Sequence, residues 1–351
     1  MTLRRYINNP ILTREDIPDI PPRVVNASSV FNPGAVYHAE RFKLLLRVQT
    51  RGRRSHLLMA ESRDGIRFRV SDHLVELRGL DQVPGVVHHV YDPRITRIDH
   101  VYYVMVAMDT DGGCRLGVVR TEDFETFDFL GMTSSTGGPG QGGRGVKGHA
   151  GSRGDGIGGG GQSSSADVRN GVLFPEKFGG QFLRLERPNT IQLRGGPPTG
   201  RQIVLAESSD LLRWRPVATV MAGRDRYWDE LIGSGPPPIK THAGWLHIYH
   251  GIATHFGSIN IYQAGAVLLD LDDPSRVLAR TRDNVLEPRE LYELVGQVPN
   301  VVFPSGLIVK GWDGEGFAEP DSKIYLYYGA ADTCVGLANC RLADLIGACQ
   351  G

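Results

Sequence analysis

Long amphipathic helices are hard to find in the pattern of apolar and polar positions along this chain. Instead, runs of Val, Ile, Leu and Tyr with the length of a strand are bounded by Gly, Pro, Asp and Asn. Strand length, β-branched and aromatic content and flanking turn residues are together typical of β-structure. The clearest runs are FKLLLRVQT (42–50), HVYYVMVAM (100–108), QFLRLERP (181–188), GWLHIYHGI (244–252) and KIYLYYGA (323–330). The pattern therefore predicts an all-β protein.

A second pattern recurs along the chain: a small apolar strand, a short polar link and an aspartate. The copies are SHLLMAESRDG, LGVVRTEDF, IVLAESSDL, GAVLLDLDDP and VGLANCRLADL, with the aspartates Asp64, Asp123, Asp210, Asp273 and Asp344. Repeated all-strand units of this kind predict a five-bladed β-propeller, whose sheets bury their faces against neighbouring sheets and whose closed ring removes open edges. A pair of β-sandwiches with chance similarity is the alternative.

Residues 133–166 interrupt the repeat between its second and third copies. They consist almost entirely of Gly, Ser and charged residues, so they cannot bury enough apolar surface to offset the entropy lost on ordering. We therefore expect a single propeller domain over residues 1–351 with a flexible Gly/Ser-rich insertion at 133–166. In this interpretation the insertion has no role in function, and a role as a mobile lid is the alternative.

Charge and composition exclude several classes of partner. Lys+Arg and Asp+Glu both number 39, so no basic field predicts nucleic-acid binding. No apolar run is long enough to span a membrane, and the N-terminal stretch lacks the apolar segment of a secretory signal. Four cysteines without CxxC spacing, and histidines without an HExxH pattern, predict a reduced cytoplasmic protein without a metal site. A homo-oligomer is compatible with the sequence.

Candidate functional residues should lie where the innermost strands of a propeller converge on its axis. VYDPRIT (90–96) sets Asp92 beside Pro93 and Arg94, so Asp92 either ends a strand as a partner of Arg94 or serves as the acid of an active site. Other polar segments at the predicted inner strands are NPGAV, RNGVLFPEKF, YWDELIGSGPPPIKT, VPNVVFPSG and YYGAADT.

Several of these segments, in order along the chain, give it a resemblance to glycoside hydrolase family 130. They are DPRIT, LFPEK, GPPPIKT followed by GWLHIYHG, AVLLDLDDPSRV, VPNVVFPSG and YYGAADT. The family contains β-mannoside phosphorylases and β-1,2-mannosidases, and its fold is a five-bladed propeller. The resemblance implies that Asp92 is the general acid of an inverting reaction, acting on the glycosidic oxygen through a sugar hydroxyl. A carboxylic acid in this role must keep its proton near neutral pH, which requires burial or an anionic neighbour.

The resemblance also implies a phosphate site and a sugar site. Arg169, Arg187, His250 and Tyr262 match phosphate-binding positions of the family, and guanidinium groups offer paired donors to phosphate. Salt bridges between blades are the alternative role for the two arginines. The residues expected to hold the sugar are Asn32, Arg47, Gln49, Tyr91, Phe303 and Asp332. Gln49 stands where the family usually has an acidic residue, and each sugar candidate can also be an ordinary turn or core residue.

One departure from the family pattern leaves the reaction open. Leu231 stands where the family has a phosphate-binding lysine, and Glu230 lies beside it. We expect an inverting phosphorylase that cleaves β-mannosides with inorganic phosphate, gives α-mannose 1-phosphate and needs no cofactor. The alternatives are an inverting β-mannosidase that activates water with Glu230, and a propeller that binds carbohydrate without cleaving it.

Overall fold

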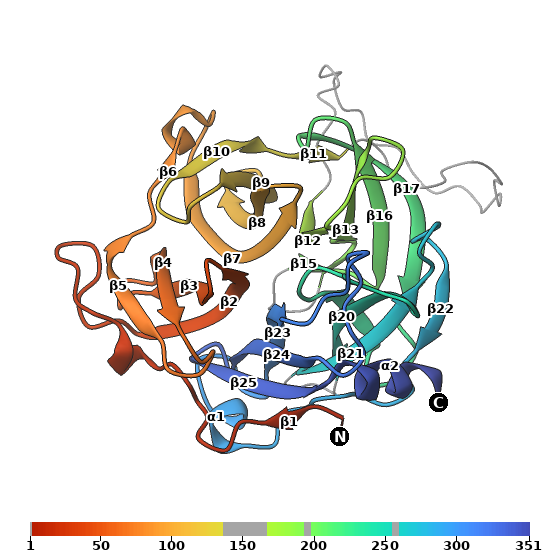
Figure 1. Cartoon of the computed structure of the whole chain (residues 1–351). Helices are drawn as coiled ribbons and strands as arrows, with labels where there is room; N and C mark the ends of the chain where they lie inside the picture. The colour runs from red at the N-terminus through yellow and green to blue at the C-terminus, as the bar shows by residue number, and fades with distance from the viewer. Residues whose placement is uncertain (1, 136–166, 193–197, 255–259) are drawn as a thin grey trace, which may run out of the picture.

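Five β-sheets surround a central axis in the computed structural model, which confirms the predicted five-bladed propeller (Figure 1). The structure describes residues 2–135, 167–192, 198–254 and 260–351. In each sheet the chain runs outward from the axis, and antiparallel neighbours follow one another in sequence. The innermost strands are β2, β7, β12, β18 and β23.

The first two blades contain residues 29–132. The strands of the first are β2 (Ser29–His38), β3 (Arg41–Gln49), β4 (Ser55–Ser62) and β5 (Arg69–Leu74). Those of the second are β7 (Val87–Ile98), β8 (Val101–Thr110), β9 (Gly113–Thr121) and β10 (Phe127–Met132), with the short β6 (Leu77–Arg78) on the outer edge. Two 3₁₀ helices, Arg14–Asp16 and Leu80–Gln82, lie in the connections.

The third and fourth blades follow the same order. The third contains β12 (Val168–Leu173), β13 (Phe182–Pro188), β16 (Gln202–Ser208) and β17 (Arg213–Ala222), with β11 (Ser134–Ser135) on its edge. The short strands β14 (Ile191–Gln192) and β15 (Pro198–Thr199) pair beside it. The fourth contains β18 (Leu231–Ser234), β19 (Ile239–Thr241), β20 (Gly244–Ala253), β21 (Ile261–Leu269) and β22 (Val277–Arg280).

The last blade joins the two ends of the chain. It contains β23 (Val302–Val309), β24 (Lys323–Ala330), β25 (Cys334–Arg341) and, as its outermost strand, β1 (Arg4–Arg5). The short helix α1 (Leu291–Leu294) precedes this blade and α2 (Leu342–Gln350) follows it. Because β1 pairs antiparallel with β25, the first strand of the chain completes the sheet that the end of the chain forms.

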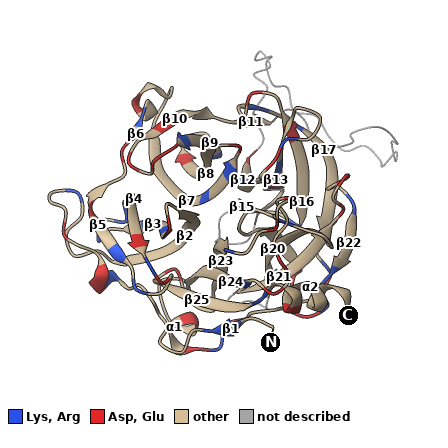
Figure 2. Cartoon of the chain, in the orientation of Figure 1, with Lys and Arg blue, Asp and Glu red and all other residues tan. Residues whose placement is uncertain are grey.

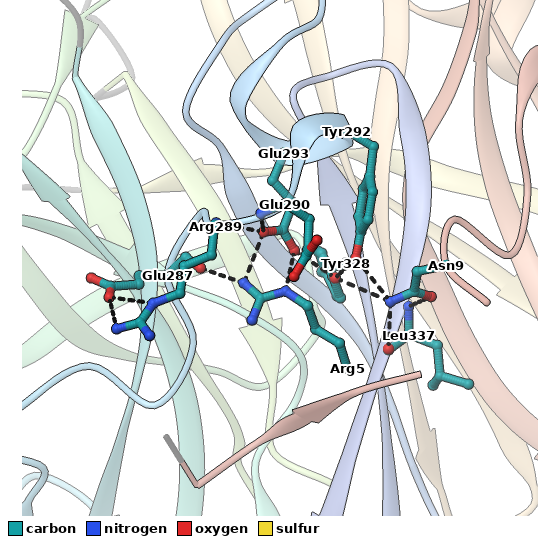
Figure 3. A network of polar contacts seen from close by, with 9 residues as sticks. All are labelled: Arg5, Asn9, Glu287, Arg289, Glu290, Tyr292, Glu293, Tyr328 and Leu337. Atoms are coloured by element: carbon teal, nitrogen blue, oxygen red, sulfur yellow. Dashed lines mark hydrogen bonds and ion pairs between the residues drawn. The ribbon is translucent and has the colours of Figure 1, made fainter. Parts of the chain in front are cut away.

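Buried ionic and polar contacts reinforce this closure (Figure 3). Glu293 on α1 is fully buried, and its carboxylate accepts hydrogen bonds from Arg5 at 2.7 and 2.8 Å and from the Tyr328 hydroxyl at 2.8 Å. The Asn9 side chain bonds both the carbonyl and the amide of Leu337 in β25, each at 2.9 Å. The N-terminal segment is therefore held by side chains as well as by strand pairing.

The apolar core is divided among the gaps between blades. Each of five buried clusters takes its members from two neighbouring sheets; for example, Leu45 and Leu57 of the first blade pack with Ile95 and Val104 of the second. A blade therefore has little core of its own, and burial of apolar area depends on the whole ring. Basic and acidic residues are interspersed around the sheets (Figure 2), in keeping with their equal numbers.

The repeated aspartates have the same structural role in the first three copies only. Asp64, Asp123 and Asp210 each accept hydrogen bonds from the backbone N–H groups two and three residues further on. These bonds close the turn between the third and fourth strands of a blade. In the fourth blade Asp270 makes the corresponding bonds in place of Asp273, and Asp344 lies in α2. The repeated pattern thus counts the blades correctly, although its aspartate closes the turn in only three of them.

The Gly-rich insertion starts later than the sequence predicts. Thr133 and Ser135 are buried, and β11 pairs with β17. Their hydroxyls bond the buried pair Arg184 and Glu186, at 3.1 Å in each case. The rest of the predicted insertion, residues 136–166, lies outside the described residues. None of the described helices is long and apolar enough to cross a bilayer.

Candidate active site

A cavity of about 570 Å³ lies at the centre of the ring, and all five blades contribute to its wall. It brings together most of the predicted site residues: Asn32, Arg47, Tyr91, Asp92, Arg169, Arg187, His250, Tyr262, Phe303 and Asp332. These residues come from segments separated by up to three hundred positions, so only ring closure makes them neighbours.

Three consecutive inner strands carry the same backbone irregularity at the cavity. The strand register shifts at Asn32 in β2, Asp92 in β7 and Asn170 in β12. All three residues have left-handed backbones, with φ of 47°, 51° and 54°. Asn and Asp tolerate this region better than other side chains with a Cβ, and a bulge can redirect a side chain out of the sheet's alternation. Each bulge supplies a polar group to the cavity wall.

Asp92 is held by groups from the first blade. Its Oδ1 accepts hydrogen bonds from Asn32 Nδ2 at 3.0 Å and from Arg47 Nη1 at 2.9 Å. The guanidinium of Arg47 lies between two aromatic rings, 4.5 Å from the centroid of Phe31 and 4.4 Å from that of Tyr91. Such cation–π stacking fixes the plane of the guanidinium. The carboxyl group of Asp92 therefore has a fixed orientation at the cavity wall.

Arg94 does not pair with the Asp92 carboxylate, contrary to the structural alternative that the sequence left open. Its guanidinium is 2% exposed and donates to the carbonyl oxygens of Gly235 at 2.8 Å, Pro93 at 3.2 Å and Asp92 at 3.3 Å. Burial lowers the pKa of Arg94 to about 10, and this still leaves it charged at neutral pH. Arg94 thus joins the bulge of the second blade to the fourth blade through main-chain bonds.

A group of cations and aromatic rings lies in the third, fourth and fifth blades. Arg187 is 6% exposed, and its Nε donates to Asn189 Oδ1 at 3.1 Å. No carboxylate of the described residues forms an ion pair with Arg187. Burial, with the repulsion of Arg169, lowers the pKa of Arg187 to about 10. The ring centroids of His250 and Phe303 are 4.7 Å apart, and Tyr262 packs beside them.

Arg169 and His250 complete the charge distribution of this wall. Burial alone would lower the pKa of Arg169, but the neighbouring Tyr91, Cys114 and Asp109 outweigh it and raise that pKa. Burial, with the nearby Arg187 and Arg94, lowers the pKa of His250 well below its usual value, so its imidazole is neutral. Two guanidinium groups and a neutral imidazole therefore share this wall. Arg169 has Asp109 nearby, whereas Arg187 has no carboxylate partner among the described residues, so this part of the wall suits an anion.

Asp332, in the last blade, contributes another carboxyl group to the cavity. It follows β24 with a left-handed backbone and is partly buried. Burial raises its pKa to about 6; the guanidinium of Arg47 opposes this rise and the carboxylate of Asp92 adds to it. A carboxyl group of this kind can both donate to and accept from a hydroxyl near neutral pH.

Two predicted residues do not line the cavity. Gln49 is buried at the end of β3 and paired in the sheet with Ser29 and Ser55. Glu230 is bonded by the hydroxyl of Thr254 rather than directed into the cavity wall. The position of Leu231 is also buried inside the fourth blade, at 4% exposure. Leu231 therefore contributes no group to the cavity wall.

The cavity also contains polar residues that sequence reasoning did not assign to the site. Asp109 accepts a hydrogen bond of 2.6 Å from the Tyr91 hydroxyl and lies 3.9 Å from Arg169. Asn170 Oδ1, Asn32 Oδ1 and Arg169 Nε are buried without a hydrogen-bond partner among the described residues. Buried polar atoms normally find partners, so these atoms point to a ligand. The three strand bulges share a sequence signal, which is Asn or Asp directly before Pro or Gly in NPG, DPR and NGV.

Groups suited to a metal ion are not found in the described residues, where no three His, Cys, Asp or Glu side chains gather for this purpose. The groups that line the cavity are hydrogen-bond donors and acceptors, guanidinium groups and aromatic rings.

The chain belongs to glycoside hydrolase family 130, because the family model described as β-1,4-mannooligosaccharide phosphorylase matches residues 2–350. A β-1,4-mannooligosaccharide phosphorylase of Ruminococcus albus is 30% identical over 97% of this chain and 89% of its own length. A 1,2-β-oligomannan phosphorylase of a Thermoanaerobacter species is 32% identical over 94% of this chain and 97% of its own. The solved β-1,2-mannobiose phosphorylase of Listeria innocua, in complex with β-1,2-mannobiose, has the same fold, with a TM-score of 0.77, 24% identity and coverage of 100% of this chain and 99% of that one.

Proposed function

We propose that this protein is an inverting phosphorylase that cleaves β-mannosides with inorganic phosphate, giving α-mannose 1-phosphate and a shortened acceptor. The family and the phosphorylase relatives support phosphorolysis of β-mannosides. The observation that carries the proposal is the buried Arg187 beside Arg169, with no carboxylate paired to Arg187 among the described residues. A bound phosphate would supply the missing negative charge.

The proposed reaction assigns a role to each part of the cavity. A phosphate oxygen bound at Arg169 and Arg187 attacks the anomeric carbon as the glycosidic C–O bond breaks. The bonding electrons stay on the leaving oxygen, which receives a proton originating from Asp92. Attack from the face opposite the leaving group inverts the configuration. Asn32, Arg47 and Asp332 hold the sugar hydroxyls, and Phe303 contributes an apolar surface.

The products distinguish phosphorolysis from hydrolysis. The enzyme is incubated with β-1,4- and β-1,2-mannobiose, with and without phosphate, and the products are separated by chromatography. We expect mannose 1-phosphate, formed only when phosphate is present. Free mannose released at the same rate without phosphate would establish a hydrolase in place of the phosphorylase. Binding of the sugars without turnover would establish a silent carbohydrate-binding propeller.

Asp92→Asn tests the acid. It preserves the shape of the side chain, so the left-handed backbone and the bond from Arg47 can persist, but it cannot donate the catalytic proton. We expect kcat with phosphate to fall about 10²- to 10⁴-fold, the usual contribution of a general acid. Asp128→Asn is the matched control, since Asp128 forms an exposed ion pair with Arg78. Unchanged turnover in Asp92→Asn would remove Asp92 from the mechanism.

A further inference from the structure

A second hollow, of about 600 Å³, lies between the first and second blades. Strand β4 and the start of β7 form two of its sides, and the connection that contains β6 forms another. Residues central to it are Ser55, His56, Leu57, Leu77, Val87 and His89. None of these residues has a part in the proposed reaction.

This hollow lies beside the axial cavity, at the junction of the first and second blades. Arg47, which lines the cavity, is the cross-strand partner of Leu57, which lines the hollow. On β7, His89 lies two residues before Tyr91, and its cross-strand partner Asp109 lines the cavity. Cross-strand partners, and residues two apart on a strand, share one face of a sheet. Residues that line the two spaces are therefore neighbours at the junction of the first and second blades.

The proposed reaction indicates which part of the substrate extends toward this hollow. In an inverting displacement the nucleophile and the leaving group lie on opposite sides of the anomeric carbon. The candidate phosphate residues Arg169, Arg187 and His250 belong to the third and fourth blades, whereas Asp92 and its partner Arg47 belong to the second and first. The leaving acceptor should therefore extend toward the first and second blades, where the hollow begins.

The chemistry of the hollow suits a neutral polyhydroxylated ligand. Its arginines are already paired: Arg23 with Glu76 at 2.6 Å and Arg78 with Asp128 at 2.9 Å. His89 Nδ1 is buried without a hydrogen-bond partner among the described residues. Burial lowers the pKa of both His56 and His89, so both imidazoles are neutral near pH 7. A neutral imidazole has one donor and one acceptor, as a sugar hydroxyl does.

We propose that this hollow binds the acceptor end of a β-mannooligosaccharide, namely the sugar residues beyond the first one on the leaving side. The imidazoles of His56 and His89 bond the hydroxyls of these residues, and the partly buried Leu77 and Val87 contact the apolar faces of their rings. The inference rests on the proposed phosphorylase function. It predicts that the enzyme prefers oligosaccharides to disaccharides.

Chain-length dependence tests the inference. The kcat/KM with phosphate is measured on β-mannobiose and β-mannotetraose, of the linkage that the wild type cleaves, for the wild type and for His56→Ala/His89→Ala. Loss of two hydrogen bonds should lower kcat/KM on the tetraose by about 10-fold and leave kcat/KM on the disaccharide unchanged. His73→Ala is the matched control, because His73 is an exposed imidazole outside the hollow.

The possible failures are distinguishable. If the wild type forms no sugar phosphate from any mannoside, the proposed function falls, and this inference falls with it. If the disaccharide is phosphorolysed but the double variant keeps the wild-type chain-length preference, the inference alone is wrong. His56→Ala and His89→Ala as single variants provide the same comparison if the double variant does not fold.

Discussion

At the scale of single residues, the cavity depends on a backbone conformation that few side chains tolerate. Asn32, Asp92 and Asn170 combine a left-handed backbone with a polar group directed to the cavity. Asn and Asp are enriched in this region of φ/ψ space, and most other residues with a Cβ are strained there. The same residue type thus satisfies the backbone and supplies the chemistry at all three bulges.

Asp332 gives a pH-dependent prediction at this scale. Its pKa in the folded protein is raised to about 6, above that of an unfolded aspartate. The folded state therefore binds a proton more tightly, and stability should fall as pH rises from about 4 to about 6. Relative to Asp332→Asn, we expect the wild type to lose about 1–2 kcal/mol of unfolding free energy over this interval.

Urea unfolding of both proteins at pH 4.5, 5.5 and 7 measures this difference, and other carboxylates cancel in the comparison. Asparagine suits the left-handed backbone of position 332, so the substitution adds little strain. A constant difference between the two proteins across this range would show that the Asp332 carboxyl titrates normally.

Single residues were predictable from the sequence only where a recognisable segment marked them. The DPRIT segment marked Asp92 as a candidate. The left-handed backbone that directs its carboxyl group to the cavity could not be predicted from the sequence. Asp109 escaped because it follows an ordinary apolar strand, and its importance comes from the cross-strand position beside Tyr91. Gln49 and Glu230 were chosen by their place in the chain, and the direction of a side chain depends on strand register.

At the scale of elements, the inner strands are joined across the axis rather than only around the ring. Arg94 of β7 bonds the carbonyl of Gly235, which follows β18 in the fourth blade, as well as the two carbonyls of its own bulge. A rigid planar guanidinium can satisfy three acceptors at once, and a lysine ammonium on a flexible stem has a different reach. Arg94 therefore fixes where the Asp92 bulge lies relative to the opposite wall.

Arg94→Lys should separate this positioning role from the charge. The charge is kept but the bonds to three carbonyls cannot all form, so we expect about 2 kcal/mol of lost stability. We also expect kcat to fall more than KM rises, because the bulge carries the acid. Arg97→Lys is the matched control, since Arg97 is an exposed residue of the same strand that bonds the Asp99 carbonyl. Equal kinetics in the two variants would contradict the positioning role.

Strands were the most predictable elements. All five runs chosen from apolar patterning became the second strand of a blade, from β3 to β24. The turn aspartates were less predictable, because GAVLLDLDDP offers several carboxylates and only the hydrogen bonds select Asp270. Short edge strands such as β1 and β11 were missed, since two residues carry no periodicity.

At the scale of the whole molecule, the ring depends on contacts between the two ends of the chain. Arg5 and Glu293 form an ion pair whose carboxylate is fully buried and also bonded by Tyr328. Removing one partner of a buried pair leaves the other charge uncompensated. The network shown in Figure 3 therefore contributes to stability in the last blade, and none of its residues lines the axial cavity.

Glu293→Gln should destabilise the protein without a direct effect on chemistry. We expect a loss of about 3–5 kcal/mol of unfolding free energy, the usual cost of breaking a buried pair, measured by urea denaturation. Glu15→Gln removes an exposed pair with Arg14 and should leave the denaturation midpoint unchanged. At low temperature, where Glu293→Gln remains folded, kcat should equal that of the wild type. Equal denaturation midpoints for the two variants would show that the closure network adds nothing.

The number of blades could be read from the chain, but not the spatial neighbours across the cavity. Repetition reveals how many units there are because each unit must satisfy the same turns and the same inter-sheet packing. The meeting of Arg47 with Asp92, or of Arg94 with Gly235, depends on the rotation of one blade against another. No local sequence pattern determines that rotation.

The position of β1 in the last blade also has a consequence for synthesis. Residues 4 and 5 are synthesised more than three hundred residues before their partners on β25, Asn339 and Ala338. The nascent chain must therefore keep this strand unpaired while the first four sheets are synthesised. Slowed translation of the final blade should extend that period.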